Sequence, residues 1–338
     1  MIHQQPEKII ELARTSVGYK GKAKSDKVVK SDISVYALKG ELVAIIGENG
    51  VGKSTLLRTI AGFQPPISGD IRICGKPISR YREKDLALLM SFVSTEIIRV
   101  SNLSVFDLVS LGRYPHTNWF GKLLEEDMNM IEEAISSVGL RGYENRMVNH
   151  LSDGERQKVM IARTLAQNTD IIVLDEPTAF LDLSNKYEIV HILHRLASDK
   201  GKTILFSTHD LTTAIAESDR LWLMLHESVE QGAPEDLILN GNFNAIFQNK
   251  NIYFDQEKGD FRILKQTKLT ACVTVEGLPL NWTIKALVRN GFEVVDSANQ
   301  STIQITVNYP HWTVTHLAEL LKFDSLLSLC GYLKGLEN

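Results

Sequence analysis

A glycine-rich segment near residue 50 has the residue types of a phosphate-binding loop. It follows an apolar run and consists of Gly47, Glu48, Asn49, Gly50, Val51, Gly52, Lys53, Ser54 and Thr55. Glycines let backbone N–H groups close around phosphate oxygens, and a helix after the loop directs its positive end at the same charge. The pattern predicts that Lys53 contacts the β- and γ-phosphates of a nucleotide and that Ser54 binds Mg²⁺. Alone, the loop indicates a nucleotide-binding protein, a class that includes kinases and GTPases.

Further polar side chains stand where a predicted helix begins or a predicted strand ends. One motif opens a helix and consists of Leu151, Ser152, Asp153, Gly154 and Glu155. There Ser152 and Gly154 can offer a hydroxyl and backbone N–H groups to an anion. Asp175 ends an apolar strand, where a carboxylate can hold Mg²⁺, and the adjacent Glu176 can act as a general base toward water. His209 follows another apolar strand; an isolated histidine would more often be structural, but this ordered set favours a catalytic role.

In this order and at these distances, the motifs resemble those of the ABC ATPase family over about residues 10 to 235. Segment 151–155 is similar to the family's LSGGE-type signature, and Asp182 resembles its D-loop residue. The resemblance implies a head-to-tail dimer of cassettes that binds ATP with Mg²⁺. The signature of one copy contacts the γ-phosphate held by the other copy, and Asp182 links the two sites, so one copy alone lacks a complete site.

The resemblance also assigns individual roles. It makes Glu176 the catalytic base and His209 the sensor of the γ-phosphate, with Lys53 holding the phosphates. Asp153 replaces the family's usual second glycine, and we expect its side chain to point away from phosphate. Tyr19 resembles the aromatic residue that stacks on adenine, while packing in the core stays an alternative for this residue.

One departure from the family concerns the metal. The family has a glutamine at a strand end after the first hairpin, where it reaches Mg²⁺ and contacts the membrane subunit. Alignment places Thr95 at that position, followed by Glu96. The shorter hydroxyl of Thr95 would need a bridging water, Glu96 could act instead, and a shift of the alignment by one residue is a third possibility.

The hydrophobic pattern indicates two domains. We expect an α/β P-loop cassette over residues 9–250, with a mixed sheet core, an antiparallel β subdomain and a helical subdomain over about 97–150. Within it, the segment 68–79 predicts a hairpin with Gly75 and Lys76 at its turn, and Ser104 with Asp107 predicts a capping box. Residues 262–338 predict a small α+β domain of order β-α-β-β-α, with 314–322 as a helix. This domain either stabilises packing or a dimer, or senses a small ligand; we favour the first.

The helical segment indicates a subfamily. Leu111, Gly112, Arg113, Tyr114, Pro115 and His116 are similar to a motif of ATPases that energise iron-siderophore, haem and cobalamin importers, although a helix end followed by a proline turn would look the same. The implied partners are a second copy, two permease chains and, indirectly, a substrate-binding protein, at the cytoplasmic face of the membrane. An ABC ATPase of another transporter class and a soluble non-transport ABC protein are the alternatives.

Composition limits the other possibilities. The 338 residues carry a formal net charge of −4, which gives no support for nucleic acid as a partner. No signal peptide or membrane-spanning run is predicted, so other chains would have to cross the membrane. Cys74, Cys272 and Cys330 lack metal-ligand spacing. A small-molecule kinase is disfavoured by the signature, and a catalytically dead cassette by the presence of Lys53 and Glu176.

Overall fold

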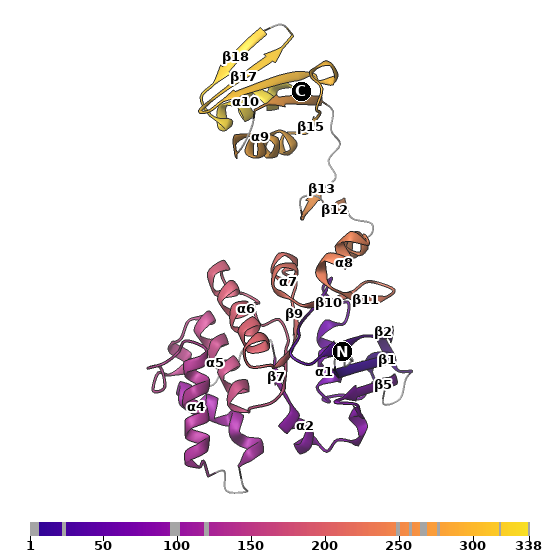
Figure 1. Ribbon diagram of the computed structural model, residues 1–338, viewed down its shortest axis with the longest axis vertical. Coiled ribbons are helices and arrows are strands. Elements are labelled where there is room, and N and C mark those ends of the chain that lie inside the picture. Colours follow the sequence, from indigo (N-terminus) through magenta and orange to yellow (C-terminus); the bar gives the residue numbers. More distant parts are fainter. Residues whose placement is uncertain are drawn as a thin grey trace, which may run out of the picture. The chain divides into compact units, whose positions relative to one another are not determined.

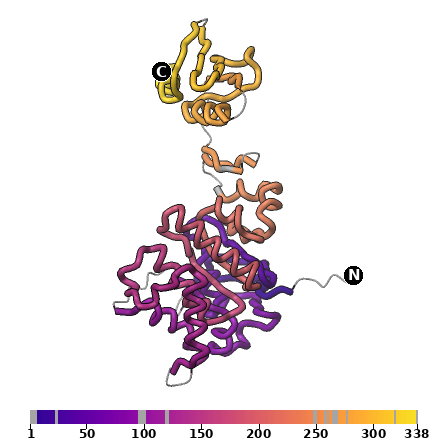
Figure 2. The backbone as a smooth tube through the Cα atoms, turned by 60° about the vertical axis from the view of Figure 1, so that its left-hand side comes forward, coloured from indigo at the N-terminus to yellow at the C-terminus, as the bar shows by residue number. Residues whose placement is uncertain are grey.

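The chain forms two compact units in a computed structural model (Figure 1). The structure describes residues 7–21, 25–94, 102–117, 122–247, 251–256, 259–263, 269–275, 278–317 and 319–336. One unit comprises residues 1–248 and 256–260, and the other comprises 249–255 and 261–338. Figure 2 traces both units along the backbone. Among the described residues, no helix has the length and apolar character needed to cross a membrane.

A six-stranded sheet of order β11-β10-β4-β9-β8-β7 lies at the centre of the first unit. All its neighbours pair in parallel except β11, which is antiparallel to β10. The middle strands read as apolar runs because both faces of a parallel sheet are covered. The strands are β4 (Leu42–Gly47), β7 (Met90–Val93), β8 (Ile171–Leu174), β9 (Thr203–Ser207), β10 (Arg220–Met224) and β11 (Val229–Gly232).

An antiparallel sheet lies beside the central one (Figure 1). Its strands are β1 (Lys8–Tyr19), β2 (Lys27–Ile33), β3 (Tyr36–Leu38), β5 (Ser68–Ile73) and β6 (Lys76–Pro77). The hairpin of β5 and β6 forms as predicted, but its turn is at Cys74 and Gly75. Ile73 pairs directly with Lys76, so Lys76 belongs to the strand.

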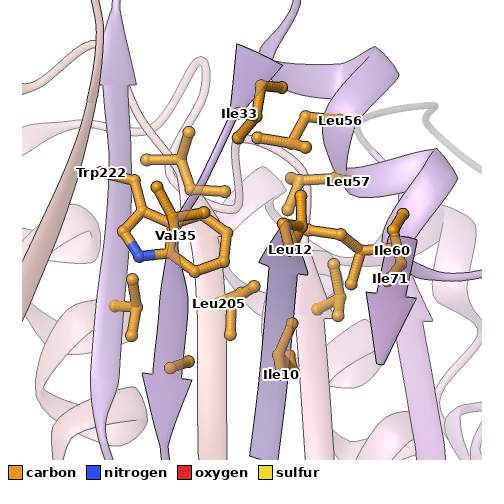
Figure 3. Close-up of a cluster of buried hydrophobic side chains, with 14 of the residues drawn as sticks. Ile10, Leu12, Ile33, Val35, Leu56, Leu57, Ile60, Ile71, Leu205 and Trp222 are labelled. Atoms are coloured by element: carbon orange, nitrogen blue, oxygen red, sulfur yellow. The ribbon is translucent and has the colours of Figure 1, made fainter. Parts of the chain in front are cut away.

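Helix α1 (Lys53–Ile60) packs between the two sheets and joins their cores. Figure 3 shows Leu56, Leu57 and Ile60 of α1 among apolar side chains of the antiparallel and central sheets. Leu12 of β1 and Trp222 of β10 belong to the same buried cluster. This packing fixes where α1 begins, and therefore where the phosphate loop lies.

The helical segment follows β7. It contains α3 (Val105–Ser110), η2 (Leu111–His116), α4 (Glu125–Ser137), η3 (Val148–His150) and α5 (Asp153–Ala166). Two shorter helices, η1 (Ile78–Arg80) and α2 (Glu83–Leu89), lie between β6 and β7. The predicted capping box of Ser104 and Asp107 is confirmed at the start of α3. η2 packs closely on α5, because a Cβ at Gly112 would lie 2.1 Å from the Arg163 carbonyl oxygen.

The remaining helices of the first unit follow the strands of the central sheet. α6 (Leu183–Ser198) follows β8, α7 (Leu211–Glu217) follows β9, and α8 (Pro234–Leu239) with η4 (Asn242–Phe247) follows β11. α6 connects β8 to β9 and α7 connects β9 to β10, so these two helices lie in crossover connections of the kind a parallel sheet requires.

Within its described residues, the second unit has a five-stranded sheet of order β15-β14-β16-β17-β18, a two-stranded sheet of β12 and β13, and two α-helices. Its elements are β12 (Ile252–Asp255), β13 (Asp260–Ile263), β14 (Leu269–Thr274), α9 (Leu278–Arg289), β15 (Phe292–Val294), η5 (Ala298–Gln300), β16 (Ile303–Asn308), β17 (His311–His316), β18 (Glu319–Phe323) and α10 (Leu326–Leu336). The helix predicted over 314–322 is wrong, since β17 and β18 pair antiparallel there. Buried Trp312 and Val314 alternate with threonines, a period of two that marks a strand.

Candidate nucleotide site

The phosphate loop runs from the end of β4 into α1, as the sequence predicts. Gly52 has φ 112° and caps α1 without a side-chain hydrogen bond, so the first N–H groups of the helix have no side-chain acceptor there. At Gly47, with φ 154°, a Cβ would lie 2.5 Å from the Met224 carbonyl oxygen. The loop can therefore take this close path only with glycine at both positions, and it presents helix N–H groups to an anion.

Lys53 folds back over the loop. Its Nζ donates to the carbonyl oxygens of Gly47 at 2.9 Å and Glu48 at 3.2 Å, and the residue is 5% exposed. Desolvation lowers the pKa of Lys53, while the nearby carboxylates of Glu176 and Asp175 act in the opposite direction. The ammonium group can exchange its carbonyl partners for phosphate oxygens without moving away from the loop.

Asp175 lies at the end of β8 with two hydroxyl partners. Ser54 Oγ donates to its Oδ1 at 3.0 Å, and Ser207 Oγ, at the end of β9, donates to the same atom at 2.7 Å. A hydroxyl and a carboxylate oxygen side by side are the hard oxygen donors that Mg²⁺ prefers, with water and phosphate completing the shell. The arrangement at Ser54 and Asp175 therefore fits the predicted metal.

Ser207 also belongs to the candidate site, although the sequence analysis did not single it out. Besides bonding to Asp175, its Oγ accepts the Glu176 N–H at 2.8 Å. Glu176 has φ 48°, in the left-handed region that residues other than glycine rarely adopt. The signal was present, because Ser207 stands two residues before His209 at the end of an apolar strand.

His209 and Glu176 lie next to each other. His209 Nδ1 is 3.7 Å from Glu176 Oε2, beyond hydrogen-bond distance, and the two side chains are 51% and 25% exposed. Both groups are thus accessible at the carboxyl ends of parallel strands, the edge where α/β sheets bind ligands.

Tyr19 ends β1 beside the phosphate loop. Its hydroxyl lies 3.2 Å from Thr55 Oγ1, a distance at which either atom can donate, and the residue is 53% exposed. An aromatic residue this exposed does not serve the core, so the packing alternative does not apply. Stacking on adenine stays a prediction.

The signature residues begin α5. Ser152 is the N-cap, and its Oγ accepts the Glu155 N–H at 3.3 Å while the Ser152 N–H donates to the Glu155 carboxylate at 2.8 Å. The Ser152 N–H first, and then the Ser152 hydroxyl, which donates to Glu155 Oε2 at 2.9 Å, lower the pKa of the Glu155 carboxyl group. Asp153 pairs with Arg156. Asp153, which stands where the family has glycine, is therefore held by an ion pair within its own helix, α5.

Asp182 caps the next helix, α6. Its Oδ1 accepts the Asn185 N–H at 2.8 Å. The starts of α5 and α6 are in contact, since a Cβ at Gly154 would lie 2.4 Å from Asn185 Oδ1. Thr95 and Glu96, by contrast, lie outside the described residues.

Fold and site together define an ATP-hydrolysing P-loop cassette. The family described as ABC transporter matches residues 31–179, and the family described as iron ABC transporter C-terminal domain matches residues 268–334. An uncharacterized ABC transporter ATP-binding protein of Methanocaldococcus jannaschii is 36% identical over 85% of this chain and 98% of its own length. The chain belongs to the ABC transporter ATP-binding proteins.

Two further proteins refine the comparison. The iron(3+)-hydroxamate import ATP-binding protein FhuC of Bacillus subtilis is 40% identical over 66% of this chain and 83% of its own length. A dimeric bacterial ABC transporter cassette of known structure is 26% identical, with a TM-score of 0.58 over 67% of this chain and 98% of that one. The predicted family, its fold class and its ATPase activity are thereby confirmed.

Proposed function

We propose that this chain is the ATP-hydrolysing subunit of an importer for an iron chelate. The observation that carries this proposal is the joint similarity of the cassette to a hydroxamate import ATPase and of residues 268–334 to an iron-transporter C-terminal domain. Siderophores are the favoured cargo, and haem or cobalamin is the alternative that the sequence leaves open.

Within one copy, we assign the hydrolytic roles by position. Segment 47–55 cradles the phosphates with Lys53 over them, and Glu176 accepts a proton from the attacking water as its oxygen bonds to the γ-phosphorus and ADP leaves. His209, 3.7 Å from Glu176, aligns that water with the γ-phosphate. Ser54 and Asp175 hold Mg²⁺, which neutralises phosphate charge when bound. The exposed ring of Tyr19 stacks on the adenine.

A second copy completes each site. Ser152, Asp153, Gly154 and Glu155 of one copy face the γ-phosphate bound by the other copy, and Asp182 lies at the contact between them. Support comes from the dimeric cassette to which this chain is similar and from the position of these residues at helix starts, where backbone N–H groups favour anions.

The permeases dock on a groove of about 520 Å³ between α1, α2, β7 and α5. Phe63 at its rim is 66% exposed and meets Phe92 edge to face, with ring centroids 5.0 Å apart. Arg163 also lines the groove, and desolvation lowers its pKa. An exposed aromatic beside a partly dehydrated guanidinium is typical of a protein interface. Docked there, the chain is a peripheral subunit at the cytoplasmic face of the membrane, and a substrate-binding protein delivers the chelate.

We propose residues 9–250 as the cassette, about 97–150 as its helical subdomain and 262–338 as an accessory domain. The division into two compact units and the separate family matches support these boundaries. For the accessory domain we favour a packing or dimer-stabilising role.

Uptake of labelled ferric siderophore, haem and cobalamin in cells that carry only the Lys53→Ala protein tests the proposal. We expect loss of siderophore uptake, because the phosphates of ATP lose their contact with the Lys53 ammonium group. Lys122→Ala, at an exposed lysine, is the matched control and keeps uptake. Unchanged uptake of all three compounds by Lys53→Ala, at equal protein levels, would contradict the importer role.

A further inference from the structure

A small cavity lies where the helical segment meets the rest of the cassette. It has a volume of about 100 Å³ and is lined by residues of α4, of the end of α5 and the turn after it, and of the stretch from the end of α6 to Lys202. None of the described residues that line it belongs to the candidate nucleotide site or to the groove proposed for the permeases. ATP hydrolysis and permease docking therefore give this cavity no role.

The most buried residues of the cavity are apolar. Ala134 of α4 is 4% exposed and Leu196 of α6 is 6% exposed. Met130 and Leu165, which also line the cavity, are half-buried. An apolar cavity of about 150 Å³ can hold benzene, so this smaller one suits a short hydrocarbon chain. The three helices thus form a place for the apolar part of a small ligand.

Two lysines line the same cavity, and their surroundings differ. Lys200 Nζ donates to Glu133 Oε1 at 3.2 Å, and both side chains are more than half exposed. The side chain of Lys202 is only 17% exposed. Its ion-pair partner is the largely exposed Asp170, whose Oδ1 lies 3.9 Å from Lys202 Nζ, too far for a hydrogen bond. Within the described parts of the chain, the Lys202 ammonium group therefore has no hydrogen-bond acceptor.

A partly dehydrated ammonium group beside an apolar cavity favours an anion with an apolar body. Desolvation lowers the pKa of Lys202, Asp170 acts in the opposite direction, and the nearby charge of Lys200 lowers the pKa further. A charge withdrawn from water is costly unless an opposite charge hydrogen-bonds to it. A carboxylate can accept those hydrogen bonds, whereas a cationic ligand would meet two positive charges.

We propose that this cavity binds a small amphipathic carboxylate. Its oxygens accept hydrogen bonds from Lys202, and its hydrocarbon part packs on Ala134 and Leu196. A bound ligand joins α4 of the helical segment to the stretch of chain that leads into β9. The site is separate from the nucleotide and from the transported cargo, so its failure would leave the proposed function untouched.

Titration of the full-length chain with pentanoate tests this site, with the ε-methyl NMR signals of the methionines as the readout. Met130 lines the cavity, whereas Met128, on the same helix, is 38% exposed and does not line it. We expect a saturable shift of the Met130 signal and no shift of the Met128 signal. Substitution of each of these methionines by leucine assigns the two signals.

Lys202→Met removes the ammonium group and keeps an apolar stem. We expect pentanoate to bind this variant at least about tenfold more weakly, because the carboxylate loses its charged partner. Lys84→Met, at an exposed lysine of α2, is the matched control for the loss of one positive charge, and it should bind pentanoate like the unaltered chain. Binding of a fluorescent ATP analogue, unchanged in both variants, reports an intact fold.

Pentan-1-ol tests the need for charge without any substitution. It keeps the hydrocarbon chain but lacks the carboxylate, so it should bind the unaltered chain at least about tenfold more weakly than pentanoate does. The absence of a saturable Met130 shift with pentanoate would overturn the site. Equal binding of pentanoate and pentan-1-ol, or equal binding of pentanoate by Lys202→Met and the unaltered chain, would overturn the assignment of a carboxylate ligand.

Discussion

Ser207 connects the two carboxylates of the nucleotide site. It donates to Asp175 Oδ1 at 2.7 Å and accepts the Glu176 N–H at 2.8 Å, so one hydroxyl contacts both the carboxylate that we propose holds Mg²⁺ and the backbone of the residue that we propose is the base. A group that orients two functional residues contributes through their positions, in the way outer-shell partners support metal ligands.

Ser207→Ala should lower kcat for ATP hydrolysis about tenfold and leave the affinity for ATP nearly unchanged. Phosphate release and binding of a fluorescent ATP analogue measure the two quantities. Ser91→Ala is the control, because Ser91 is also a buried strand serine, 1% exposed, but lies on β7 without a contact to these carboxylates. If Ser207→Ala and Ser91→Ala hydrolysed ATP at the same rate, Ser207 would have no role in positioning the two carboxylates.

Glu176→Gln should reduce hydrolysis at least about 100-fold while ATP still binds, because the amide cannot accept the proton of the attacking water. Single-turnover phosphate release measures the chemical step. Glu126→Gln, at an exposed glutamate of α4, should hydrolyse ATP normally. Substantial hydrolysis by Glu176→Gln would mean that another group is the base.

At the scale of elements, the helical segment is held together by a buried ion pair. Arg113 Nε of η2 donates to Asp127 Oδ1 of α4 at 2.7 Å, and the side chains are only 6% and 9% exposed. Arg113 also donates to the Ala166 carbonyl oxygen at the end of α5, at 2.9 Å. The residue that suggested a subfamily from sequence therefore ties three helices together.

Asp127→Ala should reduce the free energy of unfolding by about 3 kcal/mol, because it leaves the Arg113 charge buried without its partner. Urea unfolding measures this difference. Asp127→Leu combined with Arg113→Met should recover most of the loss, whereas Glu126→Ala should change stability little. A small effect of Asp127→Ala would show that water reaches Arg113.

The same pair predicts a pH dependence. The Leu124 N–H first, and then Arg113, hold the pKa of Asp127 below its ordinary value. Because the folded-state pKa is lowered, this stabilisation is complete above the unfolded-state pKa of about 4 and is lost as pH falls below it. The difference in the free energy of unfolding between the unaltered protein and Asp127→Asn, measured by urea titration, should therefore narrow as the pH falls below about 4. If this difference in the free energy of unfolding did not change with pH, the lowered pKa of Asp127 would be contradicted.

At the scale of the whole molecule, each unit has a core of its own. The buried cluster of the second unit is built from its sheet and both its helices, and consists of Ala271, Leu287, Phe292, Ile303, Ile305, Val307, Trp312, Val314, Leu329 and Leu333. A unit with its own core can be removed without opening the core of the other.

A chain ending at residue 263 should therefore fold and bind ATP like the full-length protein. Circular dichroism and nucleotide titration measure both properties, with the Lys53→Ala form of the same short chain as the non-binding control. If the short chain aggregates or loses ATP affinity, residues 264–338 belong to the structural core of the cassette.

The family and the fold class could be inferred from the sequence alone, and so could a set of candidate site residues. This was possible because a phosphate loop, a signature and a strand-end Asp-Glu pair are short contiguous motifs whose function depends on local backbone geometry. The hairpin at 68–77 and the capping box at Ser104 were predictable for the same reason.

Only the tertiary structure decided which of these residues meet. Ser54 reaches Asp175 although 121 positions separate them, because β4 and β8 both pair with β9 and end at one edge of the sheet. Parallel pairing also brings Ser207 to Asp175, and packing on α5 turns Arg113 toward Asp127. Such contacts depend on which elements pack together, and a local pattern does not contain that information.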